Sequence, residues 1–349
     1  MPGIVLGPQA CSAPVKDPTY WNQIVGTQSG VNHIESVSCA NIMDTPPLQA
    51  LVTVSSIGPA ATLDIYVYKN ITSTKPVQIF KLQGLLKGDA KISGYNTVMT
   101  AEVDKNSALN AGKTTSAMTT DLFREFDWSG EPGTLVQTVF PGFFPDLTRY
   151  QAEKDQIMVN VGRTDTWKLD ALETTKRFAQ ALLRTPPDSA VTLVSGGGVH
   201  DVDAIVNVTP PVLPGCCGPF PPIKVTLSRL EGSTNSGIWI VVGVESGQKA
   251  ITAPQKGDHL NSPVTVEGSG SQFESQVGIV HILDHLYTDI GHSIAKGTSG
   301  LGFGPFSVNV SYEASFHGGA QEGIVVLYDE NGGGASLRGG VAMVKVLLN

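Results

Sequence analysis

The last hundred residues alternate between short apolar runs and clusters of turn-forming residues, and this alternation restricts the fold more than any other feature of the chain. Seven runs have the period-2 pattern of β-strands: Ala250–Ala253, Pro263–Glu267, Val277–Leu283, Ile290–Ala295, Phe306–Phe316, Gly323–Leu327 and Val341–Leu348. Glycine-rich segments lie between them, at 256–258, 268–270, 297–304, 318–319 and 331–334. Seven short strands with turns at this density predict a seven-strand immunoglobulin-like β-sandwich.

The whole chain is too long for one compact core, and we expect a mostly β protein with an α+β centre. The expected regions are an N-terminal arm (1–45), a β-rich domain (46–145), an α+β domain (146–247) and the sandwich (248–349). The arm is rich in Ser, Asn, Pro and Gly, so we expect it to be ordered only where it docks.

Three helices are expected before the sandwich. Met118, Leu122 and Phe126 lie four residues apart, which predicts a short amphipathic helix over Ala117–Asp127. Asp146 and Asp170 are the expected N-caps of two further helices. The second of these has an apolar face formed by Leu172, Phe178, Leu182 and Leu183.

Composition excludes several classes of protein. Hydrophobic residues make up 41% of the chain and charged residues 15%, which excludes a disordered protein. The net charge of −8, without a cluster of Lys and Arg, argues against nucleic-acid binding and against a polybasic membrane anchor. No apolar window is long enough for a transmembrane helix.

The cysteines and the N-terminus bear on the compartment. The first residues have no basic n-region and only a short apolar run, so they do not resemble a signal peptide. We interpret this start as trimmed or replaced, with a cytosolic protein as the alternative. Four cysteines in loops, Cys11, Cys39, Cys216 and Cys217, favour an oxidising compartment. A Cys11–Cys39 disulfide would pin the arm, whereas Cys216 and Cys217 are open to pairing with each other, pairing with the arm, or remaining free.

Short motifs of the sandwich carry a resemblance to a known family. They are Ile251–Pro254, Ser262–Gly268, Phe273–Val277, Val280–Asp284, Pro305–Val308 and Gly323–Tyr328. The segment resembles the immunoglobulin-like domain associated with bacterial spore germination proteins. This resemblance implies an extracellular or surface-attached module without catalytic residues. The region Trp167–Val244 is similar to uncharacterised domains of exported or lipoprotein-like bacterial proteins.

The densest group of potential metal ligands is the run from His281 to His292. Along a strand, His281 and His285 point to one face, and a hairpin would bring His285 towards His292. Imidazoles with a neighbouring carboxylate would suit zinc or another transition metal. The alternative is that these side chains line the solvent face of the hairpin, with Asp284 as a turn residue. No other cofactor is expected.

Aromatic residues gather near the expected boundary of the first two domains: Trp128, Phe140, Phe143, Phe144 and Tyr150. Such a group either binds a ligand by stacking on sugar rings or filling a partner's pocket, or forms core between domains. Among them, Trp128, Phe143, Phe144 and Tyr150 are the candidate ligand-binding residues.

We therefore predict a non-catalytic binding or scaffolding protein of the cell envelope or the extracellular space. Its expected partner is a cell-wall polymer or a surface protein, and self-assembly through strand edges is a variant of this hypothesis. The alternative is a cell-envelope hydrolase with its site between the first two domains, which a cleft with paired carboxylates would favour.

Overall fold

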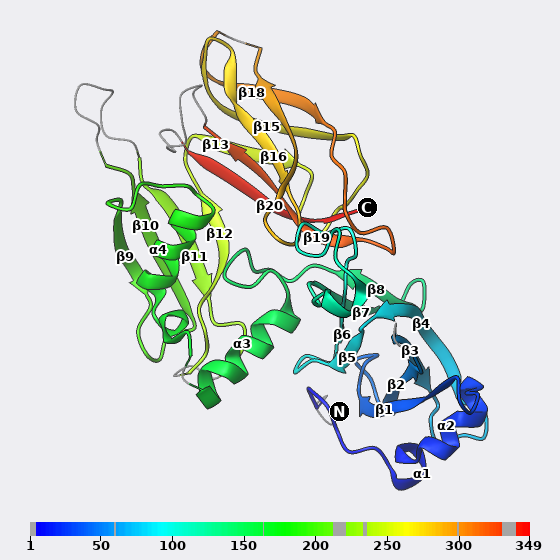
Figure 1. Cartoon of the computed structure of the whole chain (residues 1–349). Helices are drawn as coiled ribbons and strands as arrows, with labels where there is room; N and C mark the ends of the chain where they lie inside the picture. Colours follow the sequence, from blue (N-terminus) through cyan, green and yellow to red (C-terminus); the bar gives the residue numbers. More distant parts are fainter. Residues whose placement is uncertain are drawn as a thin grey trace. The chain divides into compact units, whose positions relative to one another are not determined.

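The computed structural model describes residues 5–58, 61–162, 164–211, 221–232, 236–298, 300–329 and 340–349. The chain divides into two compact units, Met1–Thr138 and Val139–Asn349. Both consist mainly of antiparallel sheets, and the predicted mostly β fold with a C-terminal immunoglobulin-like domain is confirmed (Figure 1). Among the helices that the structure describes, none combines the length and the apolar character needed to cross a membrane.

The first unit is built on two four-stranded antiparallel meanders. Its eight strands are β1 (Asn32–Ala40), β2 (Gln49–Ser56), β3 (Thr62–Lys69), β4 (Val77–Leu86), β5 (Asp89–Ile92), β6 (Val98–Glu102), β7 (Leu122–Ser129) and β8 (Thr134–Thr138). Strands β1–β4 form one sheet and β5–β8 the other, each in sequence order. Apolar residues of both sheets, among them Leu51, Ile65, Val98 and Phe126, share one core. The unit is therefore a β-sandwich of its own.

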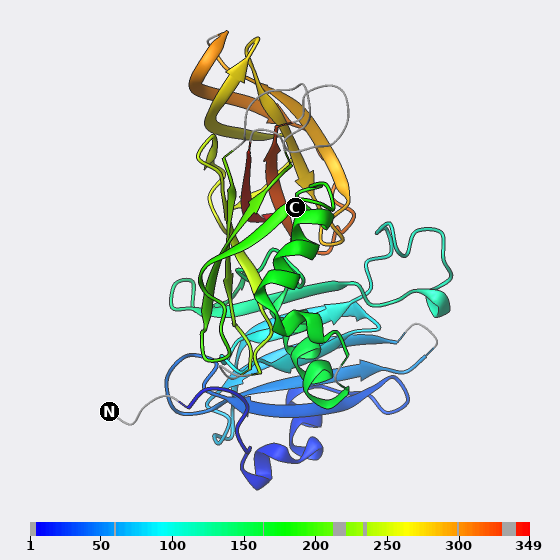
Figure 2. The same cartoon turned by 90° about the vertical axis from the view of Figure 1, so that its left-hand side faces the viewer.

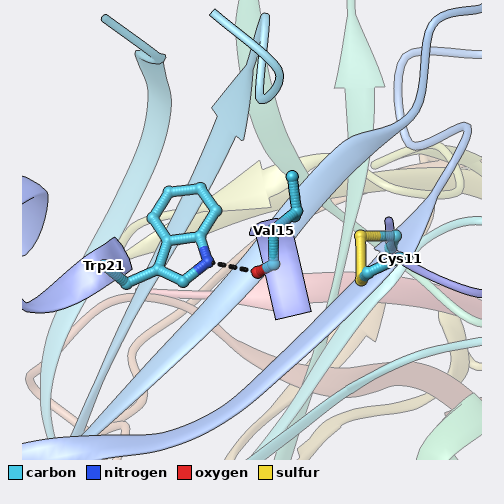
Figure 3. The surroundings of a disulfide bond; sticks show 4 residues. Cys11, Val15 and Trp21 are labelled. Carbon is cyan, nitrogen blue, oxygen red and sulfur yellow. Dashed lines mark hydrogen bonds between the residues drawn. A yellow bond between two sulfur atoms is a disulfide. The ribbon is translucent and has the colours of Figure 1, made fainter. Parts of the chain in front are cut away.

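Residues expected to form a loose arm belong to this sandwich instead. Helices α1 (Ala13–Lys16) and α2 (Pro18–Val25) pack on the face of the first sheet that points away from the shared core, and β1 is the edge strand of that sheet. Trp21 is fully buried there, and its Nε1 donates a 2.7 Å hydrogen bond to the carbonyl of Val15 (Figure 3). One large aromatic side chain thus anchors a segment whose average composition suggested little structure.

The prediction of a helix over Ala117–Asp127 is wrong. A short 3₁₀ turn (Thr115–Ala117) is followed by strand β7, which pairs with both β6 and β8. Leu122 and Phe126 are four residues apart, a spacing that fits one face of a strand as well as one face of a helix. The segment forms a strand because β6 and β8 satisfy its backbone hydrogen bonds on both sides.

The second unit begins with an α+β layer. Its helices are α3 (Arg149–Gly162), the 3₁₀ turn η2 (Thr166–Leu169) and α4 (Ala171–Ala181). Its strands are β9 (Ala190–Gly196), β10 (Asp203–Thr209), β11 (Ile223–Ser228) and β12 (Ile240–Glu245), in the order β12-β11-β10-β9. Helix α4 lies against one face of this sheet (Figure 2), and its Phe178 is buried there. Helix α3 packs near Ile240 on the opposite face.

One of the two predicted caps is right. The side chain of Asp170 accepts hydrogen bonds from the amides of Leu172 and Glu173 and begins α4. Asp146 does not cap α3. The cap of α3 is a capping box formed by Thr148 and Gln151. The amide of Thr148 donates a hydrogen bond to Oε1 of Gln151, and the amide of Gln151 donates one to Oγ1 of Thr148. Leu172, expected on the apolar face of α4, is 38% exposed.

The remaining strands fold into the predicted immunoglobulin-like sandwich, with eight strands in place of the seven expected, because β14 was not predicted. They are β13 (Lys249–Ala253), the two-residue β14 (His259–Leu260), β15 (Val264–Phe273), β16 (Gln276–Leu283), β17 (Asp289–Lys296), β18 (Leu301–Val310), β19 (Gln321–Tyr328) and β20 (Val341–Leu348). The ladder between β15 and β16 consists of the single pair Phe273–Gln276, so the sheet folds over there into two layers. Strands β13, β15 and β18 form one layer, and β17, β16, β19, β20 and β14 form the other. Val266, Val310, Ile282 and Leu327 pack between them.

The α+β layer and the sandwich share a continuous core. The outward residues Ile324, Val326 and Tyr328 of β19 belong to the same buried cluster as Phe178 of α4 and Val225 of β11. The Tyr328 hydroxyl donates a 2.5 Å hydrogen bond to the carbonyl of Leu182. The layer β16-β19-β20 is therefore buried on both faces, which explains why every residue of β19 is buried.

Candidate functional site

The hairpin of β16 and β17 brings two histidines and one carboxylate together. His281 of β16 and His292 of β17 are directly opposite each other in the antiparallel ladder. Asp289 begins β17, and its Oδ2 lies 2.8 Å from Nδ1 of His281 and 3.2 Å from Nδ1 of His292. We call these three residues the His–Asp–His cluster.

A β-bulge allows Asp289 and His292 to share a face. Residues three positions apart on a regular strand point to opposite sides of the sheet. Here Ile282 pairs with Gly291 and Leu283 with Asp289, so the register shifts by one residue at Ile290. The extra residue restores the common face, as bulges do where they redirect a side chain.

The cluster is half open to solvent. His281 is 5% exposed, and its ring meets the buried Tyr328 edge-on with centroids 5.4 Å apart. The side chain of His292 is 64% exposed and that of Asp289 is 28% exposed. The other carboxylate oxygen of Asp289, Oδ1, accepts a 3.2 Å hydrogen bond from the amide of Gly291. This bond orients the carboxylate so that Oδ2 faces both imidazoles.

Two of the three members of the cluster, His281 and His292, were predicted as metal ligands from the sequence. His285, the predicted third ligand, lies beyond the end of β16 and is buried, and the residue opposite His292 is His281. Asp284 is a turn residue, whose Oδ1 accepts hydrogen bonds of 2.8 Å from the amides of Leu286 and Thr288. Asp289 was missed because its side-chain direction depends on the bulge, which the apolar pattern does not reveal.

A second candidate surface is the outer face of β15 and β18. These strands pair over their full length, from Val264–Val310 to Phe273–Leu301. Alternate residues point away from the core: Thr265, Glu267, Ser269, Ser271 and Phe273 on β15, and Leu301, Phe303, Pro305, Ser307 and Asn309 on β18. We call these ten residues the outer strip. Its polar end is ordered by a 2.8 Å hydrogen bond from Thr265 to Asn309.

Three large apolar side chains at the other end of the outer strip are open to solvent. Phe273 is 64%, Leu301 70% and Phe303 61% exposed. Towards the middle of the strip lies a groove of about 470 Å³. The groove is lined by Thr252, Glu267, Gly268, Lys296, Thr298, Pro305, Phe306 and Ser307. The strip and its groove together therefore combine exposed aromatic rings with hydroxyl, carboxylate and ammonium groups.

The aromatic residues predicted to bind a ligand are divided between the two units. Trp128 lies on β7 of the first unit and packs partly against its core. In the second unit Phe143 is buried, and the ring of Phe144 lies 5.9 Å from that of Phe178. Tyr150 is half-buried in the first turn of α3. Phe143 and Phe144 contribute to the core of the second unit.

One disulfide joins two of the four cysteines. Cys11 and Cys39 are bonded, with their Cα atoms 5.4 Å apart (Figure 3). Cys39 is fully buried at the end of β1, and its carbonyl accepts a 2.7 Å hydrogen bond from the amide of Gln9. The disulfide thus attaches the residues before α1 to the first sheet. Cys216 and Cys217 lie outside the described residues.

The two mainly antiparallel layers of the C-terminal region, with their shared apolar core, form an immunoglobulin-like β-sandwich. Residues 250–334 match the protein family described as the immunoglobulin-like domain of bacterial spore germination. This is the family that the short motifs of the segment resemble. A comparison of the chain with curated proteins gives no match.

Proposed function

We propose that this protein is a non-catalytic binding and scaffolding protein of the bacterial cell envelope or extracellular space, and that its sandwich binds the glycan of the cell wall. The observation that carries the proposal is the outer strip, with Phe273 and Phe303 exposed and a groove that contains Glu267, Lys296 and Ser307. The family matched by residues 250–334 supports a bacterial envelope setting.

The disulfide supports a location outside the cytoplasm. Thiols of cytosolic proteins are kept reduced, whereas disulfides persist in exported proteins. The Cys11–Cys39 bond lies beside the fully buried Trp21, so it forms part of the packed structure of the first unit. The same location gives the protein access to wall polymer.

The chemistry of the outer strip favours a glycan over an apolar protein surface. Sugar rings present flat C–H faces that stack on aromatic side chains, with hydroxyl groups around their edges. Phe303 supplies the exposed ring, and Glu267, Lys296 and Ser307 offer hydrogen-bonding groups in the adjacent groove. From Leu301 to Asn309 the strip is about 27 Å long, at about 3.4 Å per residue, which suits an extended chain.

Co-sedimentation with isolated peptidoglycan tests the proposal. We expect the purified protein to pellet with peptidoglycan and to stay in solution in buffer alone. The double variant F273S/F303S should stay in solution in both, because it lacks the exposed rings. The matched control L193S/V194S removes two apolar side chains that are 46% and 55% exposed on the edge strand β9. It should pellet like the unaltered protein.

The other outcomes contradict the proposal in distinguishable ways. A protein that stays in solution with peptidoglycan does not bind the wall. Pelleting in buffer alone indicates self-assembly. Release of soluble wall fragments during the incubation supports the alternative of an envelope hydrolase. Equal pelleting of both double variants would place the binding surface away from the outer strip.

A further inference from the structure

We infer that the His–Asp–His cluster binds a divalent transition-metal ion of the zinc type, held by Nδ1 of His281, Oδ2 of Asp289 and Nδ1 of His292. This site is independent of glycan binding by the outer strip. The ligand atoms of the three residues all lie within 4.8 Å of one another. The inference rests on their spacing, their chemistry and the backbone that fixes them.

The spacing fits a tetrahedral metal ion. Zinc lies about 2.0–2.1 Å from imidazole nitrogen and about 2.0–2.2 Å from carboxylate oxygen, so neighbouring ligands in a tetrahedron are roughly 3.3 Å apart. The distances from Oδ2 of Asp289 to the two Nδ1 atoms are 2.8 and 3.2 Å. An outward movement of the carboxylate by about half an ångström or less would bring both of these distances to the ligand spacing.

The chemistry of the ligands selects the class of metal. Two imidazoles and one carboxylate suit zinc and its neighbours among the transition metals, whereas magnesium and calcium prefer oxygen ligands throughout. Three protein ligands leave a fourth position for water. The exposed side of His292 gives the solvent access that this position requires.

The backbone holds the ligands before any metal arrives. His281 and His292 are fixed opposite each other by the β16–β17 ladder. The bulge at Ile290 turns Asp289 towards them, and the amide of Gly291 holds its Oδ1. Such a hydrogen bond to a ligating carboxylate orients it and raises metal affinity. Gly291 itself is fixed by close packing, since a Cβ there would lie 2.3 Å from the carbonyl oxygen of Ser311.

Metal titration of the full-length protein, after treatment with a chelator, tests the inference. Isothermal titration calorimetry with Zn²⁺ should give a saturable isotherm of about one ion per chain. Co²⁺ should produce the intense visible absorption bands of a tetrahedral site and be displaced by Zn²⁺. The variants H292A and D289N alter half-open side chains and should leave the far-ultraviolet circular dichroism spectrum unchanged. Both should lose the isotherm and the Co²⁺ bands.

The matched control is H317A, which removes an exposed histidine after β18. It should bind Zn²⁺ as the unaltered protein does. The inference is overturned if the unaltered protein takes up no Zn²⁺ in a saturable way, or if H292A and H317A bind it equally. A cluster held together by hydrogen bonds alone predicts the first of these results.

Discussion

The ammonium group of Lys345 lies 2.8 Å from the carboxylate of Glu322, and neither side chain has any exposed surface. The same Nζ donates hydrogen bonds to the carbonyls of Gly142 and Leu147, at 2.7 and 2.5 Å. Glu322 in turn accepts a 3.3 Å bond from the amide of Phe140. The pair therefore connects residues 140–147, at the start of the second unit, to strands β19 and β20. Burial lowers the pKa of Lys345, while the charge of Glu322 opposes this shift.

Replacing Lys345 by Met should destabilise the second unit by about 3–5 kcal/mol, because it leaves a buried carboxylate without its counter-charge. The double variant E322Q/K345M should lose less, since no charge is left buried. Urea unfolding followed by circular dichroism measures both. The control K176M changes an exposed lysine of α4 and should unfold like the unaltered protein. A double variant less stable than K345M would show that the charges are not coupled in this way.

Removing the disulfide should destabilise the first unit. The double variant C11S/C39S opens a loop with a sequence separation of 28 residues, and loop entropy predicts a loss of about 3–4 kcal/mol. Urea unfolding with and without a reducing agent measures this effect. The reducing agent should lower the stability of the unaltered protein and leave that of the double variant unchanged. A double variant as stable as the oxidised protein would contradict the prediction.

The strands of the sandwich could be predicted because short apolar runs alternate with clusters of turn-forming residues, but two of the expected breaks were misplaced. The sequence predicts a turn at residues 268–270, whereas Gly268 and Gly270 lie inside β15. A Cβ at Gly268 would lie 2.1 Å from the carbonyl oxygen of Ala250, so this glycine serves the close approach of a neighbouring strand. Likewise, β18 begins at Leu301, inside the segment expected to be a glycine loop.

The candidate sites depend on features that a sequence pattern does not encode. His281 and His292 were found because residue type alone marks them as ligands. Asp289 points towards the two histidines only because of the bulge at Ile290. A bulge has no simple sequence signature, so the position of this carboxylate could not be predicted. The sequence does not indicate the outer strip, because Phe273, Leu301 and Phe303 lie outside all seven predicted strands. Their exposure follows from the pairing of β15 with β18, which only the structure supplies.

Substituting Gly291 by Ala should destabilise the sandwich by about 1–3 kcal/mol, because a new methyl group would be forced into a closed space. Its Cβ would lie 2.3 Å from the carbonyl oxygen of Ser311 and 2.9 Å from Cα of Tyr312. Thermal unfolding measures the loss. G247A is the matched control, since nothing lies within 4 Å of a Cβ at that position. Equal stability of the two variants would mean that the segment at Ser311 moves freely away from β17.

Asp146 should make the second unit less stable as the pH rises. Burial raises the pKa of its carboxyl group from 3.8 to about 6, an effect that the charge of Lys168 partly offsets and that of Asp165 reinforces. Between about pH 4 and pH 6 the folded state then binds more protons than the unfolded state, so the free energy of unfolding falls as the pH increases. Above pH 6 both states are ionised and this contribution is constant. A shift of about two pKa units corresponds to about 3 kcal/mol.

The variant D146N carries no charge at any pH and should lose this dependence. We expect it to match the unaltered protein near pH 4 and to exceed its stability at pH 8, by at most about 3 kcal/mol. Urea unfolding at a series of pH values measures the difference. D188N, which changes an exposed aspartate, should follow the unaltered protein throughout. If D146N is less stable than the unaltered protein at pH 8, the ionised carboxylate stabilises the fold, and burial does not control its pKa.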